Sequence, residues 1–140
     1  MQESKTLNYY EDKPQEFIES TVNVDFRETQ DKFLKLLAPK AHILDFGCGS
    51  GRDTKYFLEQ GFQVTAIDGS AELCKFASAL TGIEVKQMFF QELSAIECYD
   101  GIWACSSILH LPYTELEDVF LKMVKAVKNG GVIYASFKYG

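Results

Sequence analysis

The chain reads Leu44-Asp45-Phe46-Gly47-Cys48-Gly49-Ser50-Gly51-Arg52-Asp53 where an apolar strand passes through an acid into three alternating glycines and then into a helix. Glycine has no Cβ, so a glycine-rich turn can adopt positive φ angles and lie against a ligand. Asp45 adds a carboxylate at the end of the strand. This order predicts a site for a nucleotide-type cofactor between the strand and the helix.

The spacing of the glycines decides between cofactors. A dinucleotide fingerprint needs glycines at its first, third and sixth positions. Counting from Gly47, the sixth position is Arg52, so the glycine that lets helix and strand pack closely is missing. A nicotinamide dinucleotide-binding domain is therefore kept only as a remote alternative.

The pattern that stands here instead, Asp-x-Gly-x-Gly-x-Gly, resembles the first motif of the class I S-adenosylmethionine-dependent methyltransferases. In that family the acid, through its own contacts and bound water, helps to hold the ammonium group of the cofactor, and the glycines admit its methionine and ribose portions. The resemblance implies cofactor contacts along this turn, at Asp45, Gly47, Cys48, Gly49 and Gly51.

Composition favours one globular domain over residues 1–140, with 46% hydrophobic and 14% aromatic residues. No apolar run approaches about 20 residues and no basic start precedes an apolar segment, so we expect no membrane span, no signal peptide and a cytoplasmic protein. The net charge of -6 disfavours nucleic acid as a partner. Scattered cysteines and only two histidines suggest no metal site.

From residue 41 onward, short apolar runs alternate with amphipathic stretches, which predicts a doubly wound, mostly parallel Rossmann-like α/β sheet in the order 3-2-1-4-5 with helices on both faces. An N-terminal arm and a short helix over residues 14–21 precede this core, which we place at residues 25–140. The expected strands cover residues 43–46, 62–67, 83–87, 101–104 and 132–137.

Several residues have the character of helix ends. Asp25 with Glu28, and Thr114 with Glu117, have the spacing of a capping box. Pro39 marks the end of the helix that Asp25 opens, and its apolar face is expected at Phe26, Phe33, Leu34 and Leu37. Ser70 is placed as an N-cap, Gly61 and Gly82 lie where helices should end, and residues 129–131 predict a turn into the fifth strand.

In a doubly wound sheet the ligand crevice lies at the carboxyl ends of the strands. Cofactor contacts are expected at Asp68, Gly69 and Ser70, which follow the second strand about 20 residues beyond the glycine turn. An acid at this distance can accept hydrogen bonds from both hydroxyls of a ribose. The alternative is that Asp68 only helps to cap the next helix, although Ser70 is available for that role.

After the third strand, the methyltransferase pattern usually has an acid that receives the adenine amino group. When the two are aligned on Phe90, Phe89 stands in the place of that acid, which is a departure from the family. The usual adenine hydrogen bond is then not expected, which leaves stacking or apolar contact from Met88, Phe89 or Phe90. The alternative is that these side chains only pack in the core.

The segment from Tyr99 to His110 closely resembles the fourth motif of the family. The resemblance implies that the backbone and small side chains of Ala104, Cys105 and Ser106 flank the sulfonium of the cofactor. Cys105 lacks a base partner in the sequence, which disfavours it as a nucleophile. His110 is the candidate for a base or acceptor-positioning group, with a capping or surface histidine as the alternative.

Arg52 can present a planar fork to the methionine carboxylate, and a solvent-facing arginine is the alternative. In the arm, Tyr10 resembles the tyrosine that folds over the cofactor in many relatives, and a simple anchoring role is equally open.

The resemblance extends over nearly the whole chain and is closest to small methyltransferases of the type 11 and tellurite-resistance-like groups. It implies transfer of a methyl group from S-adenosyl-L-methionine to an unidentified acceptor, with a small molecule favoured, and S-adenosyl-L-homocysteine as the product. Such enzymes usually continue past the fifth strand into a helix and a hairpin, so we expect a chain truncated there. The exposed strand edge would then invite a homodimer, and the alternative function is a cofactor-binding fragment of little or no activity, completed by a partner or by the missing segment.

Overall fold

The computed structural model of the chain describes residues 27–105 and 112–135. The helix predicted over residues 14–21, the cap at Asp25 and the apolar position Phe26 lie outside the described residues, as do Tyr10, Ser106 and His110.

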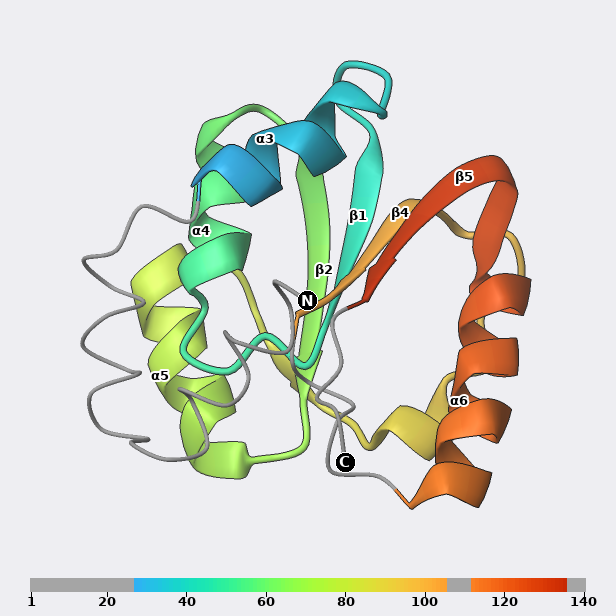
Figure 1. Cartoon of the computed structure of the whole chain (residues 1–140). Coiled ribbons are helices and arrows are strands. Elements are labelled where there is room, and N and C mark those ends of the chain that lie inside the picture. The colour runs from blue at the N-terminus through green and yellow to red at the C-terminus, as the bar shows by residue number, and fades with distance from the viewer. Residues whose placement is uncertain (1–26, 106–111, 136–140) are drawn as a thin grey trace.

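A parallel sheet of five strands forms the centre of the fold, in the order β3-β2-β1-β4-β5 (Figure 1). The predicted doubly wound α/β class and strand order are confirmed. The chain switches from one half of the sheet to the other between the neighbouring strands β1 and β4, which is where this fold forms its ligand crevice. The strands are β1 His42–Phe46, β2 Gln63–Asp68, β3 Lys86–Gln87, β4 Tyr99–Ala104 and β5 Val127–Ala135.

Helices cover both faces of the sheet, with α4 and α5 on one side and α6 on the other (Figure 1). Because side chains alternate along a strand, Ile43 packs on one face with residues of α3 and α4, while Leu44 and Phe46 pack on the other with residues of α6. The helical elements are α3 Arg27–Lys35, α4 Arg52–Glu59, α5 Ala71–Thr81, the short 3-10 helix η1 Phe90–Glu92 and α6 Tyr113–Ala126. None of the described helices is long and apolar enough to cross a membrane.

The third strand is shorter than predicted. The sequence indicated a strand over residues 83–87, whereas β3 contains only Lys86 and Gln87. Two of the missing backbone groups bond to side chains of α5 instead: the N–H of Ile83 donates to Thr81 Oγ1 at 3.4 Å, and the N–H of Val85 donates to Ser78 Oγ at 2.9 Å. Side-chain acceptors on the preceding helix therefore replace the ladder at the start of this strand.

The fifth strand is longer than predicted at its start. Its pairing with β4 is interrupted, because Tyr99 is opposite Val127 whereas Gly101, two residues later, is opposite Val132. The residues of β5 between these two pairs have no register partner of their own on β4. The predicted turn at residues 129–131 lies in this interruption, and Gly130 has a φ of +83° there. The prediction of a turn between helix and strand is therefore wrong: residues 129–131 belong to β5, and only the pairing with β4 is interrupted there.

Most of the predicted helix ends are observed. Ser70 Oγ accepts the N–H of Leu73 at 3.2 Å as the N-cap of α5, and Gly82 ends that helix with a φ of +82°. The box predicted at Thr114 and Glu117 is wrong, because α6 begins at Tyr113 and Pro112 is its N-cap. The N–H of Leu116 bonds to the carbonyl of Pro112 at 2.8 Å, so the first turn closes before Thr114 can act as a cap.

The apolar face predicted for α3 is also observed. Phe33 and Leu34 are buried, and Leu37, just beyond the helix, packs against the same cluster. The helix ends at Lys35, ahead of Pro39, and the N–H groups of Leu36 and Leu37 bond three residues back in a tightened last turn.

Candidate functional site

The glycine turn between β1 and α4 needs glycine at all three alternating positions. Gly47, Gly49 and Gly51 have φ angles of +86°, +57° and +94°, a region that side chains with a Cβ rarely adopt. The N–H groups of Gly47 and Cys48 both donate to the carbonyl of Ile67, at 3.0 and 2.9 Å. These bonds hold the turn against the end of β2.

Two of these glycines face different surroundings. Apart from Gly49 itself and its two neighbours in the chain, no described atom lies within 4 Å of the position that a Cβ would take on Gly49. A Cβ on Gly51 would lie 3.0 Å from Ala77 Cβ and 3.1 Å from Thr81 Cγ2, both on α5. Gly51 therefore lets α4 start close to α5, while Gly49 leaves open space beside the turn. The close packing against α5 is enough to explain why residue 51 is a glycine, and no ligand is needed for this explanation.

Asp68 lies at the end of β2 and connects the glycine turn to the next helix. Its Oδ1 accepts the N–H of Gly49 at 3.0 Å, and its Oδ2 accepts the N–H of Ser70, also at 3.0 Å. The side chain thus supports the start of α5, as the capping alternative required, and it also bonds to the backbone of the glycine turn at Gly49. Each carboxylate oxygen has two lone pairs, so both keep the capacity to accept a further hydrogen bond.

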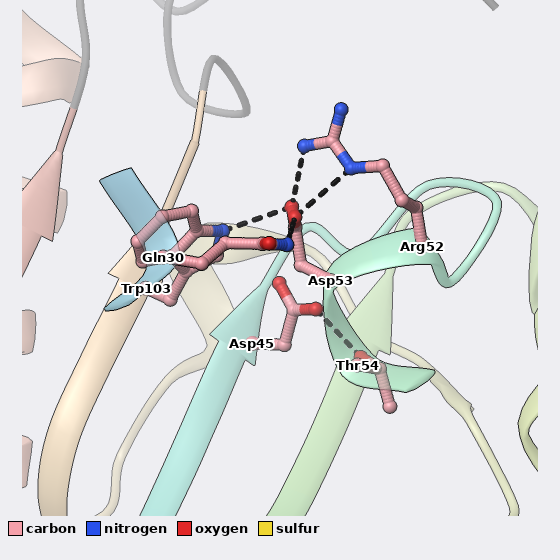
Figure 2. Close-up of polar contacts among 6 residues, drawn as sticks. All are labelled: Gln30, Asp45, Arg52, Asp53, Thr54 and Trp103. Carbon is pink, nitrogen blue, oxygen red and sulfur yellow. Dashed lines mark hydrogen bonds and ion pairs between the residues drawn. The ribbon is translucent and has the colours of Figure 1, made fainter. Parts of the chain in front are cut away.

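Asp45 lies at the end of β1 and is only 1% exposed. Its Oδ2 accepts the hydroxyl of Thr54, on α4, at 2.6 Å (Figure 2). Burial in the first place, and then the neighbouring Asp53, raise the pKa of Asp45 to about 8. Burial thus favours the protonated form of this carboxyl group, which can donate a hydrogen bond as well as accept one.

A buried polar cluster lies beside Asp45, centred on Asp53 (Figure 2). Arg52 donates to both oxygens of Asp53, from Nε at 2.9 Å and from Nη2 at 2.8 Å. Gln30 Nε2 on α3 donates to Asp53 Oδ1 at 2.6 Å, and Trp103 Nε1 on β4 donates to Oδ2 at 2.9 Å. We call these four residues, Gln30, Arg52, Asp53 and Trp103, the Asp53 cluster.

Of these four residues, the sequence predicted only Arg52 as part of the site. Its side chain is 19% exposed, so the solvent-facing alternative is wrong. A signal for the others was present: Gln30 lies three and four residues before Phe33 and Leu34, on the apolar face of α3, where a buried amide needs a partner. A tryptophan in a strand expected to be buried likewise needs an acceptor for its N–H.

The aromatic residues after β3 divide between the core and the surface. The ring of Phe90 packs on Phe46 with a centroid distance of 4.7 Å, and Met88 packs against the same cluster. Phe89 is 60% exposed, and its ring lies beside the backbone of Gly69, with Cδ1 at 3.5 Å from the place of a Cβ there. The core alternative thus describes Phe90 and Met88, whereas Phe89 lies at the rim of the site.

The remaining predicted contacts are partly described. Ala104 is buried and its methyl group packs in the core with residues of α6, so only its backbone can face a ligand, and Cys105 is half-buried. Burial raises the pKa of the Cys48 thiol, which favours the neutral form. Gly69 lies beside Asp68, and its carbonyl accepts Gln87 Nε2 at 3.2 Å. Within the described residues no group of three or more His, Cys, Asp or Glu side chains could hold a metal ion.

Comparisons with known proteins agree with this geometry. A family model described as a methyltransferase domain matches residues 43–131. The chain is 31% identical over 136 residues to the 2-methyl-6-phytyl-1,4-hydroquinone methyltransferase of Synechocystis sp., and the match covers 91% of this chain and 42% of that protein. The chain thus spans less than half the length of this curated relative.

Solved structures show the same fold. A TehB-like SAM-dependent methyltransferase from Corynebacterium glutamicum superposes with a TM-score of 0.70 at 20% identity, over 90% of this chain and 72% of that one. The [4+2]-cyclase SpnF superposes with a TM-score of 0.65 at 20% identity, over 76% of this chain and 42% of that one. At these identities the superpositions describe the fold alone.

Proposed function

Because the chain belongs to the methyltransferase-domain family, we propose that it binds S-adenosyl-L-methionine at the glycine turn and transfers its methyl group to a small-molecule acceptor. The product would be S-adenosyl-L-homocysteine. The site lies at the carboxyl ends of the strands, beside the switch between β1 and β4, as expected for a ligand of this fold.

The observation that supports this proposal most directly is the position of Asp68 opposite Gly49. The open space at Gly49 would admit the ribose, and the Asp68 carboxylate, already oriented by two N–H groups, would accept its hydroxyls. A carboxylate held in place in this way loses little freedom on binding, which favours affinity.

The methionine portion and the adenine of the cofactor would contact polar and aromatic side chains, respectively. The ammonium and carboxylate of its methionine portion would lie near the Asp45 carboxyl and the Arg52 guanidinium. Phe89, exposed beside Gly69, would contact the adenine face in place of the usual acid. Contacts from the backbone at Ala104 and Cys105 remain predictions, as do those from Tyr10 and Ser106, which lie outside the described residues. The role of His110 as a base or acceptor-positioning group also remains a prediction, and this residue too lies outside the described part of the chain.

S-adenosyl-L-methionine supplies a methyl group on a positively charged sulfur, which a nucleophile displaces in line. The residues of this chain would hold the donor in a fixed orientation and keep water from it, and holding two reactants in line lowers the barrier without a strong base. The site needs no catalytic triad for this role.

A second candidate function is cofactor binding with little or no turnover by this chain. It is favoured by the extent of the match, since the chain covers only 42% of the curated relative. The fold itself does not fix the reaction, because the superposed SpnF is a [4+2]-cyclase. We also propose a homodimer in which a second copy pairs at β5, an edge strand of the described sheet.

Calorimetric titration with S-adenosyl-L-homocysteine and with NAD tests the cofactor. We expect micromolar binding of the first and none of the second; binding of NAD alone would overturn the proposal. Incubation with S-adenosyl-L-methionine and a panel of small nucleophiles then tests transfer, through release of S-adenosyl-L-homocysteine. Binding without release for any acceptor would favour the second candidate.

A further inference from the structure

We propose that Asp53 is a positioning residue for Arg52: it holds the guanidinium where this group receives the carboxylate of an amino-acid ligand, and Gln30 and Trp103 in turn hold Asp53. The inference rests on the proposed function, in which that ligand is the methionine portion of the cofactor. It adds a residue of α3 to the machinery, although α3 lies outside residues 43–131, the part that matches the family.

The contact between Asp53 and Arg52 fixes an orientation and not only a distance. Nε and Nη2 of Arg52 bond to different oxygens of Asp53, at 2.9 and 2.8 Å (Figure 2). Two parallel bonds of this kind hold the plane of the guanidinium, which a single bond would leave free to rotate. One edge of the group is thus committed to Asp53, and this edge sets the direction in which the rest of the fork points.

Asp53 is itself held from two other elements. Gln30, which is 2% exposed, approaches from α3, and the fully buried Trp103 approaches from β4. Together with the Arg52 contacts, each oxygen of Asp53 receives two hydrogen bonds, so its lone pairs are filled. A carboxylate with no remaining acceptor capacity is a poor ligand for a substrate cation but a rigid support for its arginine.

Charge balance favours an amino-acid ligand over a simple anion. The positive charge of Arg52 is already compensated by Asp53 in a largely buried ion pair. A ligand with a single negative charge would add an uncompensated charge to this region, whereas an amino acid brings a carboxylate and an ammonium together. The Asp45 carboxyl, on the next strand end, lies within electrostatic reach of both Arg52 and Asp53.

Binding of two ligands to the full chain tests the proposal. S-adenosyl-L-homocysteine carries the amino-acid portion, and 5′-methylthioadenosine has the same adenosine and thioether without it. The test variant is Asp53→Asn, which keeps the size of the side chain but makes one of its two acceptors a donor. The matched control is Asp118→Asn on α6, where the side chain is 62% exposed and pairs only with Lys122 among the described contacts.

We expect Asp53→Asn to weaken S-adenosyl-L-homocysteine at least tenfold and to leave 5′-methylthioadenosine within about twofold, with no change in the control. The variants Gln30→Met and Trp103→Phe each remove one donor to Asp53 and keep most of the packing. Each should weaken S-adenosyl-L-homocysteine about threefold or more, again without affecting the shorter ligand. These two also test the proposal if Asp53→Asn does not fold.

A general loss of structure would weaken both ligands alike, so equal losses would overturn the positioning role. Unchanged affinity of all three variants for S-adenosyl-L-homocysteine would also overturn it. If the unmodified chain binds neither ligand, the proposed function itself fails, and the inference fails with it. If it binds both and the variants show no difference between the two ligands, only the inference fails.

Discussion

Replacing Gly49 with alanine should separate ligand binding from folding, because the structure provides two matched comparisons. Gly49, Gly51 and Gly61 all have positive φ, at +57°, +94° and +94°. A Cβ on Gly49 or Gly61 would have no described atom within 4 Å, whereas one on Gly51 would meet α5 at 3.0 Å. Gly61 follows α4 at the opposite end from the glycine turn, so it serves as a control remote from the site.

The expected losses of stability follow from these surroundings. A left-handed conformation costs alanine about 1 to 2 kcal/mol, and the smaller entropy of the unfolded alanine chain returns about 0.4 to 1 kcal/mol. Gly49→Ala and Gly61→Ala should therefore each lose about 1 kcal/mol in the free energy of unfolding. Gly51→Ala should lose about 2 to 4 kcal/mol, because overpacking against Ala77 and Thr81 adds about 1 to 3 kcal/mol.

The binding assay should give a different order. Gly49→Ala places a methyl group in the space proposed for the ribose, so we expect at least a tenfold weaker affinity for S-adenosyl-L-homocysteine. Gly61→Ala should bind as the unmodified chain does. Urea unfolding gives the stabilities, and calorimetry at a temperature where all variants are folded gives the affinities. Wild-type affinity in Gly49→Ala, or equal losses in Gly49→Ala and Gly61→Ala, would refute the assignment of this space to a ligand.

Three further predictions concern the residues around the turn. Asp68→Ala should weaken the binding of S-adenosyl-L-homocysteine at least tenfold, by about 1.4 kcal/mol or more. Ser70→Ala should cost about 1 kcal/mol of stability through the lost cap and leave the calorimetric affinity within about twofold. Unchanged affinity in Asp68→Ala would show that this carboxylate does not hold the ribose. Because the pKa of Asp45 is raised to about 8, the folded state binds more protons than the unfolded state at pH values above the ordinary Asp range. The free energy of unfolding, measured by urea titration, should therefore fall relative to that of Asp45→Asn as the pH rises towards 8. A rise would contradict the burial of this group. Phe89→Ala should weaken the calorimetric affinity for ligands that contain adenosine, with little loss of stability. Phe90→Ala should lower the free energy of unfolding by about 3 kcal/mol through loss of core packing. The reverse pattern would contradict the assignment of Phe89 to the site and of Phe90 to the core.

Local patterns in the sequence predicted the parts of the fold that local forces determine. Ser70 and Gly82 were placed correctly because a cap depends on neighbours within a few residues. The errors arose where a distant or competing group takes part. Pro112, and not Thr114, is the N-cap of α6. The first residues predicted for the third strand bond to side chains of the preceding helix.

The same distinction explains which parts of the site could be predicted. Asp68 and the glycines belong to strand ends, whose meeting follows from the parallel order of the strands. The Asp53 cluster could not be predicted in this way, because Gln30 and Asp53 are 23 residues apart and meet only through the docking of α3. Trp103 and Asp53, 50 residues apart, meet through the pairing of β4 with β1.

The interior beside β1 contains two acids and one arginine, Asp45, Asp53 and Arg52, in place of apolar side chains. Removing charges from water is costly, and a buried ion pair often stabilises no more than apolar side chains of the same size. The cost of removing a carboxylate from water is reduced in a different way for each of the two acids. Asp53 is paired with Arg52 and receives two neutral donors, while Asp45 has a pKa raised to about 8 and bonds to Thr54. The charge of Arg52 is thus balanced by Asp53, and the raised pKa of Asp45 favours its neutral form. A ligand that brings one charge of each sign would leave this balance undisturbed, which is the physical reason to expect the amino-acid end of the cofactor here.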